Sequence, residues 1–230
     1  MKTIGLLGGM SWESTVNYYR AINQGVKQAL GGLHSAKIAL YSVDFDPIEK
    51  LQHEGNWDEM AKILSEAAVG VQSAGADFLL ICTNTMHKVA PQIEAAIDIP
   101  LLHIADAIAQ ASTQQTIQTV GLLGTAFTME QDFYSGRLSE NHGLTVLIPN
   151  DADRRIVHQV IYQELCLGKV EAKSKKEYLR IMDDLAGRGA DAIILGCTEI
   201  GMLVQQTDTD IRLFDSTTIH AEKAVDYALK

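Results

Sequence analysis

Short apolar runs rich in β-branched residues alternate along the chain with longer stretches in which apolar residues recur at helical spacing. This alternation is typical of parallel strands joined by crossover helices, so we expect an α/β fold. The expected strands form two sets of four, one in each half of the chain. They cover residues 3–7, 37–43, 78–81 and 101–104, then 119–123, 144–148, 192–195 and 212–214.

The longer stretches between these strands predict helices, because each keeps apolar residues on one face and ends near Gly or Asn. Five such helices are expected, at residues 12–30, 56–75, 128–141, 153–168 and 175–189. No low-complexity linker separates the two halves of the chain.

The two halves also resemble each other in sequence. TIGLLGGMS at 3–11 matches TVGLLGTAF at 119–127, and GADFLLICTNTMHK at 75–88 matches GADAIILGCTEIGM at 189–202. More loosely, IPLLHIADAIAQA matches IRLFDSTTIHAEKA near the end of each half. A period this long is not that of a solenoid, and it indicates a tandem duplication of one α/β unit.

The duplication predicts two pseudo-symmetric domains, each with a mainly parallel four-stranded sheet flanked by helices. The expected first domain covers residues 1–103 with a C-terminal helix at 217–230, and the second covers 104–216. Ligands of open parallel sheets bind beyond the carboxyl ends of the strands. The repeated loops at 8–11, 83–85, 124–125 and 197–199 all follow strands, so we expect them to surround an active site in the cleft between the domains.

The three cysteines differ in their setting. Their odd number and spacing do not suit a disulfide framework or a zinc site. Cys166 is expected on the apolar face of a helix and Cys82 at the end of an apolar strand, so both are expected to pack as small apolar side chains. Cys197 follows a strand and precedes Thr198 and Glu199. A helix N-terminus lowers a thiol pKa, so we expect Cys197 to be reactive.

Other motifs allow more than one interpretation. GLLGGMS lacks the spacing of a dinucleotide-binding loop, and it either holds a carboxylate at a helix N-terminus or is an ordinary turn. Thr83, Asn84 and Thr85 are suited to capping a helix that begins near Met86. His87 and His103 are expected to be hydrogen-bonded core residues, because no metal-ligand cluster accompanies them.

Composition excludes several classes of partner. The 230-residue chain is 47% hydrophobic and carries a formal net charge of −10 without a Lys/Arg cluster, which argues against nucleic-acid binding and predicts a solvated acidic surface. The first apolar run is too short for a signal peptide, and no apolar stretch approaches the length of a membrane span. We therefore expect a cytoplasmic protein without a membrane partner.

The motifs GLLGGMSWEST, CTNTMHK, HIADA and GCTEI together resemble the cofactor-independent aspartate/glutamate racemase family, whose relatives include hydantoin racemases, maleate isomerases and arylmalonate decarboxylases. The resemblance covers essentially the whole chain. It implies two α/β domains, catalysis without pyridoxal phosphate or metal, and commonly a homodimer. It also implies two facing cysteines, one before Asn-Thr and one before Thr-Glu, that exchange a proton at the substrate Cα.

This chain departs from that pattern, because Thr83 stands immediately before Asn84 and Thr85 where the family has a cysteine. Cys82 lies one position earlier, and a shift of one residue in a strand turns the side chain to the other face. The internal alignment and the family motif therefore both predict Thr83 and Cys197 as the catalytic pair. Threonine is a much weaker acid than cysteine, so the enzyme is expected to favour L substrates, on which the second-half cysteine of related racemases acts.

The expected substrate follows from the same resemblance. No arginine lies between Arg20 and Arg137, and Gln52 is expected to occupy the pocket for the distal group of the substrate. The expected substrate-binding residues are Met10, Gln52, Asn84, Thr85, Thr125, Thr128, Thr198 and Glu199. The sequence thus predicts a pyridoxal-independent racemase of aspartate, glutamate or a homoserine-like amino acid. A maleate isomerase or decarboxylase type of reaction and a catalytically weak amino-acid-binding protein remain alternatives.

Overall fold

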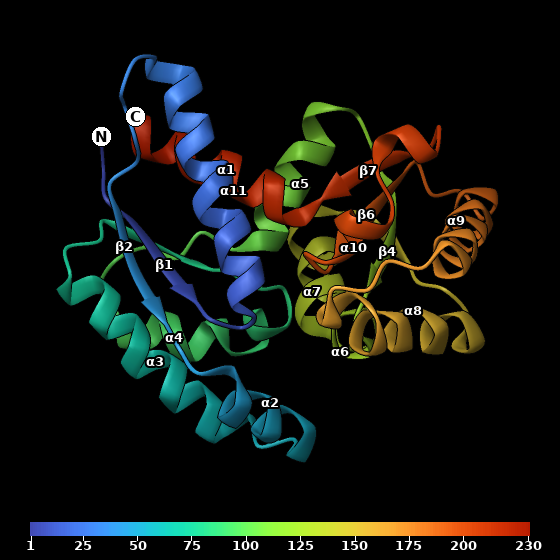
Figure 1. Cartoon of the computed structure of the whole chain (residues 1–230), viewed down its shortest axis with the longest axis horizontal. Helices are drawn as coiled ribbons and strands as arrows, with labels where there is room; N and C mark the ends of the chain where they lie inside the picture. The colour runs from blue at the N-terminus through green and yellow to red at the C-terminus, as the bar shows by residue number, and fades with distance from the viewer. The chain divides into compact units, whose positions relative to one another are not determined.

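The computed structural model describes residues 1–230, which form two compact units (Figure 1). Unit 1 contains residues 1–104 and 220–230, and unit 2 contains residues 105–219. The chain therefore crosses between the units twice, near the start of helix α5 (Ile104–Gln114) and within helix α11 (Ser216–Leu229). Each unit is an α/β structure around its own parallel sheet, which confirms the predicted fold class.

Unit 1 contains a three-stranded parallel sheet of order β2-β1-β3. The strands are β1 (Ile4–Gly8), β2 (Ile38–Ser42) and β3 (Phe78–Ile81). The helices are α1 (Trp12–Leu30), α2 (Phe45–Glu54), α3 (Trp57–Ser73) and α4 (Ala90–Ala96), and a 3-10 turn covers Thr85–Val89. Helices α1 and α3 thus agree closely with the sequence prediction.

The expected fourth strand of this sheet, at residues 101–104, is not a strand. Only Leu101 pairs with β3, through an isolated parallel bridge to Leu79. The backbone amide of Leu79 donates to Pro100 O at 2.9 Å, and that of Leu102 donates to Leu79 O at 2.9 Å. The extended segment is short because Ile104 already begins α5. The prediction of four strands was therefore wrong for unit 1.

Unit 2 contains a four-stranded parallel sheet of order β5-β4-β6-β7. Its strands are β4 (Thr119–Gly124), β5 (Thr145–Leu147), β6 (Ala192–Gly196) and β7 (Arg212–Asp215). Its other helices are α6 (Ala126–Glu130), α7 (Asp132–Gly136), α8 (Asp151–Gln163), α9 (Ala172–Gly187) and α10 (Ile200–Leu203), with a π-helical turn at Arg137–Asn141. The single helix expected at 128–141 is interrupted at Gln131, whose backbone is extended.

The repeated GAD segments have the same structural role in both units. In unit 1 the Asp77 carboxylate accepts a hydrogen bond from the amide of Thr3 at 2.6 Å. In unit 2 the Asp191 carboxylate accepts one from the amide of Thr119 at 3.0 Å. Each aspartate therefore joins the start of the central strand, β1 or β4, to the start of its parallel neighbour, β3 or β6. This equivalence supports the duplication read from the sequence.

The sheet of unit 1 is buried on both faces (Figure 1). Leu79 and Ile81 of β3 pack in a cluster with residues of α2, α3 and α4. Leu80 and Cys82 pack in a second cluster with residues of α1 and the unit 1 part of α11. Side chains of successive strand residues point to opposite faces. The side chain of residue 83 is therefore directed away from the face on which Cys82 packs.

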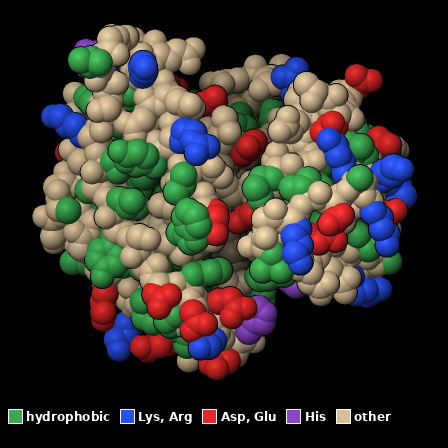
Figure 2. All heavy atoms as spheres, in the orientation of Figure 1, with side chains coloured by type: hydrophobic (Ala, Val, Ile, Leu, Met, Phe, Trp, Pro, Cys, Tyr) green, Lys and Arg blue, Asp and Glu red, His purple; other side chains and the backbone are tan.

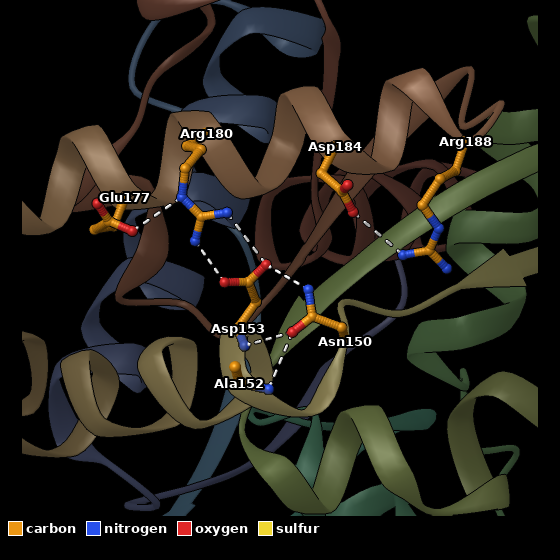
Figure 3. Close-up of polar contacts among 7 residues, drawn as sticks. All are labelled: Asn150, Ala152, Asp153, Glu177, Arg180, Asp184 and Arg188. Carbon is orange, nitrogen blue, oxygen red and sulfur yellow. Dashed lines mark hydrogen bonds and ion pairs between the residues drawn. The ribbon is translucent and has the colours of Figure 1, made fainter.

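A polar network joins α8 and α9 in unit 2 (Figure 3). Asn150 caps α8 by accepting hydrogen bonds from the amides of Ala152 and Asp153, at 3.0 and 3.1 Å. Asp153 is buried, and its carboxylate accepts a hydrogen bond from the Arg180 guanidinium of α9 at 2.5 Å. This guanidinium holds the pKa of the Asp153 carboxyl below its usual range. This ion pair lies where α8 packs against α9, so it helps to position α8, the helix that follows β5.

The surface agrees with the acidic composition. Figure 2 shows acidic side chains gathered over α2, where Asp44, Asp46 and Glu54 are exposed. Apolar side chains are also visible on unit 1, and the exposed ones include Trp12, Tyr19 and Tyr41. None of the helices combines the length and the apolar composition that crossing a membrane requires.

Candidate active site in two strand-end loops

The loop after β1 is held in one conformation by its own side chains. Gly9 has φ +95°, and a Cβ at this position would lie 2.2 Å from Val43 O, so only glycine fits. The Gly9 amide donates to Thr15 Oγ1 at 2.8 Å, and Thr15 Oγ1 donates to Ser11 O at 3.0 Å. Ser11 in turn caps α1. This turn places Met10, which is 3% exposed, next to the carboxyl end of β1.

The Thr83 loop, which we define as residues 83–85, follows the adjacent strand β3. The Cys82 amide makes the last ladder bond, to Leu7 O at 2.9 Å, so the loop leaves the sheet beside the β1 loop. The Cys82 side chain is fully buried in the core, and burial raises the pKa of its thiol far above the usual range. Thr83 is half-buried and lies outside that core cluster. The expected packing role of Cys82 is thus confirmed.

The expected helix cap in the Thr83 loop is absent. Asn84 makes no side-chain capping bond, and the chain forms a 3-10 turn before α4 begins at Ala90. The tight turn places the His87 ring against the loop, and its Nδ1 lies 2.8 Å from Thr83 O. Asn84 and Thr85 are buried, at 3% and 7% exposure. His87 therefore bonds the loop through its ring, and Asn84 does not cap the 3-10 turn.

Gln52 lies in α2 and belongs to the same unit as the Thr83 loop. Its side chain is only 2% exposed, which is unusual for a glutamine. A buried amide offers both a donor and an acceptor, so Gln52 has the chemistry needed to hold a polar group.

In unit 2, Gly124 of β4 and Gly196 of β6 are register partners. A Cβ on Gly196 would lie 2.9 Å from Leu123 O, so the two strand ends approach too closely for a side chain. Thr125 and Cys197 consequently leave the sheet from paired positions. Thr125 caps α6 through the amide of Thr128 at 3.4 Å, and the two threonine hydroxyls lie 3.3 Å apart.

The Cys197 loop, which we define as residues 197–199, contains a direct contact between two candidate residues. Cys197 Sγ donates a hydrogen bond to Glu199 Oε2 at 2.9 Å. Glu199 is 9% exposed, and Cys197 and Thr198 are half-buried. The thiol and the carboxylate are therefore hydrogen-bonded to each other, although the sequence assigned Glu199 to substrate binding.

The expected low pKa of Cys197 is wrong for the free protein. Burial raises the pKa of this thiol well above its usual range, and the negative charge of Glu199 and the bond to it raise the pKa further. The expected helix dipole contributes little, because α10 begins three residues later, at Ile200, and is only 4 residues long. These surroundings thus favour the thiol form of Cys197 over the thiolate.

Cys166 also differs from its expected environment. It is exposed, whereas the sequence predicted a packed position on a helix face. The reason is that α8 ends at Gln163 and the chain continues as a 3-10 turn at Leu165–Leu167, which changes the direction of the side chains.

Several residues near the Cys197 loop were not singled out from the sequence. Thr217 Oγ1 donates to Thr198 Oγ1 at 3.4 Å, and Ser216 Oγ donates to Leu195 O at 2.8 Å. Tyr178 is buried, and burial raises the pKa of its phenol well above the usual range. The DSTT segment after β7 was a usable signal, because it follows a strand of the repeat as the other loops do.

The structure thus assembles the candidate residues in two sets. Unit 1 holds Met10, Gln52, Thr83, Asn84 and Thr85, and unit 2 holds Thr125, Thr128, Cys197, Thr198 and Glu199. In each unit the loops come from two adjacent parallel strands. No group of three or more His, Cys, Asp or Glu residues is arranged to hold a metal ion.

Comparison with known proteins identifies relatives over the whole chain. The model of the Asp/Glu/hydantoin racemase family matches residues 7–224. The broad-specificity amino-acid racemase RacX of Bacillus subtilis is 23% identical, with 96% of both chains covered. A crystal structure of an Asp/Glu racemase candidate from Yersinia pestis is 56% identical with a TM-score of 0.95, and that of an aspartate racemase homologue from Pyrococcus horikoshii is 33% identical with a TM-score of 0.88; both comparisons cover 100% of each chain.

Proposed function

The chain belongs to the Asp/Glu/hydantoin racemase family, and from this membership we propose that it racemises acidic or small polar amino acids with Thr83 and Cys197 as the catalytic pair. The observation that carries the proposal is the 2.9 Å hydrogen bond between Cys197 Sγ and Glu199, at the carboxyl end of β6. Units 1 and 2 are proposed to be the two racemase domains, with the Thr83 loop and the Cys197 loop contributing the catalytic residues.

Inversion of a stereocentre requires one group that removes the Cα proton and a second group that returns a proton to the opposite face. In the proposed reaction the Cys197 thiolate takes the proton from the L substrate, and the electron pair of the broken C–H bond stays on Cα, delocalised into the α-carboxylate. Thr83, or a water that it positions, then delivers a proton from the other side. Hydrogen bonds from Asn84 and Thr85 would stabilise the carbanion.

Glu199 is proposed to control the proton of Cys197. Its carboxylate keeps the thiol protonated in the free enzyme, because a second negative charge beside it is unfavourable. The ammonium group of a bound amino acid would offset the charge of Glu199 and allow the thiolate to form. A thiolate with a raised pKa is also a stronger base, which suits the removal of a weakly acidic Cα proton.

The substrate class rests on Gln52 and on the names of the relatives. Gln52 is buried in unit 1, and a glutamine binds a carboxylate, an amide or a hydroxyl without a charge requirement. This favours aspartate, glutamate and homoserine over apolar or basic amino acids. We further propose that the enzyme acts without pyridoxal phosphate or metal, as a cytoplasmic homodimer.

The test is proton exchange in D2O. L-Aspartate, L-glutamate and L-homoserine are each incubated with the protein, and Cα deuteration and D product are measured by mass spectrometry and chiral chromatography. We expect deuteration of at least one of them and a lower initial rate from the D enantiomer. Turnover of maleate without any deuteration would favour the isomerase type of reaction. Ligand-induced stabilisation without exchange would favour an amino-acid-binding protein, and either result would overturn the racemase proposal.

A further inference from the structure

His87 connects the Thr83 loop to the first residue of α5. Its Nδ1 lies 2.8 Å from Thr83 O, and its Nε2 lies 3.2 Å from the amide nitrogen of Ile104. The carbonyl oxygen only accepts and the amide only donates, so Nδ1 carries the proton and Nε2 accepts. Both ring nitrogens are therefore engaged, and one tautomer is selected by the backbone on either side.

The surroundings keep this ring neutral and immobile. His87 is 1% exposed, and its ring contacts those of His103 and His220, with centroids 4.5 and 5.9 Å apart. Burial and the two neighbouring histidines lower the pKa of His87 well below its usual range. Protonation of Nε2 would also place its N–H against the N–H of Ile104, and two donors cannot form a hydrogen bond. His87 is thus a fixed hydrogen-bonding link rather than a titrating group at physiological pH.

The equivalent position of the duplicated segment has no such link. The alignment of the GAD segments places Gly201 opposite His87, and the matching segment places Asp215 opposite His103. A Cβ on Gly201 would lie 3.4 Å from Asp215 Oδ2, so a carboxylate adjoins this position in unit 2. The link belongs specifically to the loop that contains Thr83.

The hydrogen bond that fixes Thr83 O also restricts the Thr83 side chain. The peptide between Thr83 and Asn84 is planar and trans, so fixing Thr83 O also fixes the direction of the Asn84 N–H, which points away from the ring. It likewise restricts ψ of Thr83 and hence the position of its hydroxyl. Because proton delivery depends steeply on placement, a loosened carbonyl would affect the Thr83 side first.

We propose that His87 is a positioning residue for Thr83, holding its carbonyl so that proton delivery from the Thr83 face keeps pace with proton removal at Cys197. This rests on the proposed racemase function. It predicts that loss of the His87 Nδ1 donor slows formation of D product while Cα deuteration of the recovered L substrate continues.

Two variants test the hydrogen bonds of Nδ1 and Nε2 separately. In His87→Asn the side-chain amide can reproduce the Nδ1 donor to Thr83 O, whereas in His87→Gln it can reproduce the Nε2 acceptor for Ile104. With L-aspartate or L-glutamate in D2O, we expect His87→Gln to lower the ratio of D product to deuterated L substrate about tenfold, the scale of one lost hydrogen bond. His87→Asn should keep this ratio within about twofold of the unsubstituted protein.

Ser112→Ala is the control, because Ser112 is equally buried but its hydroxyl donates to Ile108 O instead of the Thr83 loop. It should lower the melting temperature without changing the ratio. The inference is overturned if His87→Gln lowers exchange and D product by the same factor, or if His87→Asn and not His87→Gln changes the ratio. Absence of both exchange and D product in the unsubstituted protein would refute the racemase proposal instead.

Discussion

The Thr83 loop and the Cys197 loop come from one duplicated segment, yet their chemistry differs at each compared position. Thr83 corresponds to Cys197, Cys82 to Gly196 and His87 to Gly201. Both loops follow the strand beside the central strand of their sheet. The central strand and its neighbour therefore recur in both copies, whereas the side chains of the loops that follow them differ.

The strand ends explain why Cys82 is not a displaced copy of Cys197. The Cys82 side chain packs between the sheet and helices α1 and α11, in a cluster with Leu80. Its counterpart Gly196 lies too close to Leu123 O to carry any side chain. A cysteine one position earlier in the strand therefore has a core environment and no access to the loop.

The electrostatic surroundings of the two loops are opposite in character. The Thr83 loop adjoins a histidine that is held neutral, and the Cys197 loop contains a carboxylate bonded to the thiol. On the Cys197 side a proton can move between ionisable groups, whereas the Thr83 side offers only a hydroxyl. Under the proposed function this difference predicts a strong preference for the L enantiomer in initial rates.

The largest expected effect is the loss of activity in Cys197→Ala. Removal of the proposed base should lower kcat for L substrates by about 10³-fold or more, since a positioned acid or base contributes rate factors of this order. Turnover in D2O measures the loss, and circular dichroism checks that the fold is retained. An alanine variant with substantial activity would show that Cys197 is not the base.

Cys82→Ala is the control within the comparison. The side chain is fully buried, so we expect a stability loss of about 1 kcal/mol from the vacated volume and an activity within about twofold of the original. A stable but inactive Cys82→Ala variant would mean that the register of the Thr83 loop in solution differs from the one described.

The second-largest expected effect is an increase in the initial rate. At saturating substrate, Thr83→Cys should raise the initial rate with D substrates by about tenfold or more, and with L substrates less, because a thiol is a far better acid and base than a hydroxyl. Chiral chromatography of both directions measures it. Equal gains in both directions, or none, would contradict the assignment of Thr83 to the D face.

Much of this architecture can be predicted from sequence periodicity and the internal repeat. The strands and the helices α1, α3 and α9 follow from apolar spacing, and the GAD repeat identifies equivalent positions in both units. The segment at 101–104 was misjudged because an apolar run of four residues does not reveal that Ile104 begins a helix. Likewise, Cys166 was placed on a helix that ends before it.

The site is only partly predictable for a different reason. Loop position follows from topology, so the Thr83 and Cys197 loops could be located from the repeat. The pKa of Cys197 could not, because it depends on burial and on which way the Glu199 carboxylate turns. The link from His87 to Ile104 spans 17 residues and depends on a 3-10 turn that sequence spacing does not indicate.

A smaller effect concerns the pH dependence of the thiol. Because the Glu199 carboxylate raises the pKa of Cys197, Glu199→Gln should lower it. The rate of Cys197 alkylation by iodoacetamide rises with pH as the thiolate forms, so this rise should move to lower pH in the variant, with alkylation about severalfold faster near neutrality. Mass spectrometry distinguishes Cys197 from the exposed Cys166. An unchanged pH profile would mean that the carboxylate turns away from the thiol in solution.

The smallest expected effect tests the part of the comparison in which the two units agree. Asp77→Ala and Asp191→Ala each remove a carboxylate that bonds the start of a central strand. Both aspartates are exposed and screened by solvent, so each substitution should cost about 1 kcal/mol in the free energy of unfolding, less than a buried hydrogen bond to a charged group contributes. Urea unfolding measures the loss, with the exposed Asp210→Ala as control.

Since both bonds lie at the ends of the strands remote from the loops, the ratio of L to D initial rates should stay unchanged. A loss in only one variant would show that the two copies have diverged in their scaffold as well as in their loops, and a changed ratio would show that strand starts and loops are coupled.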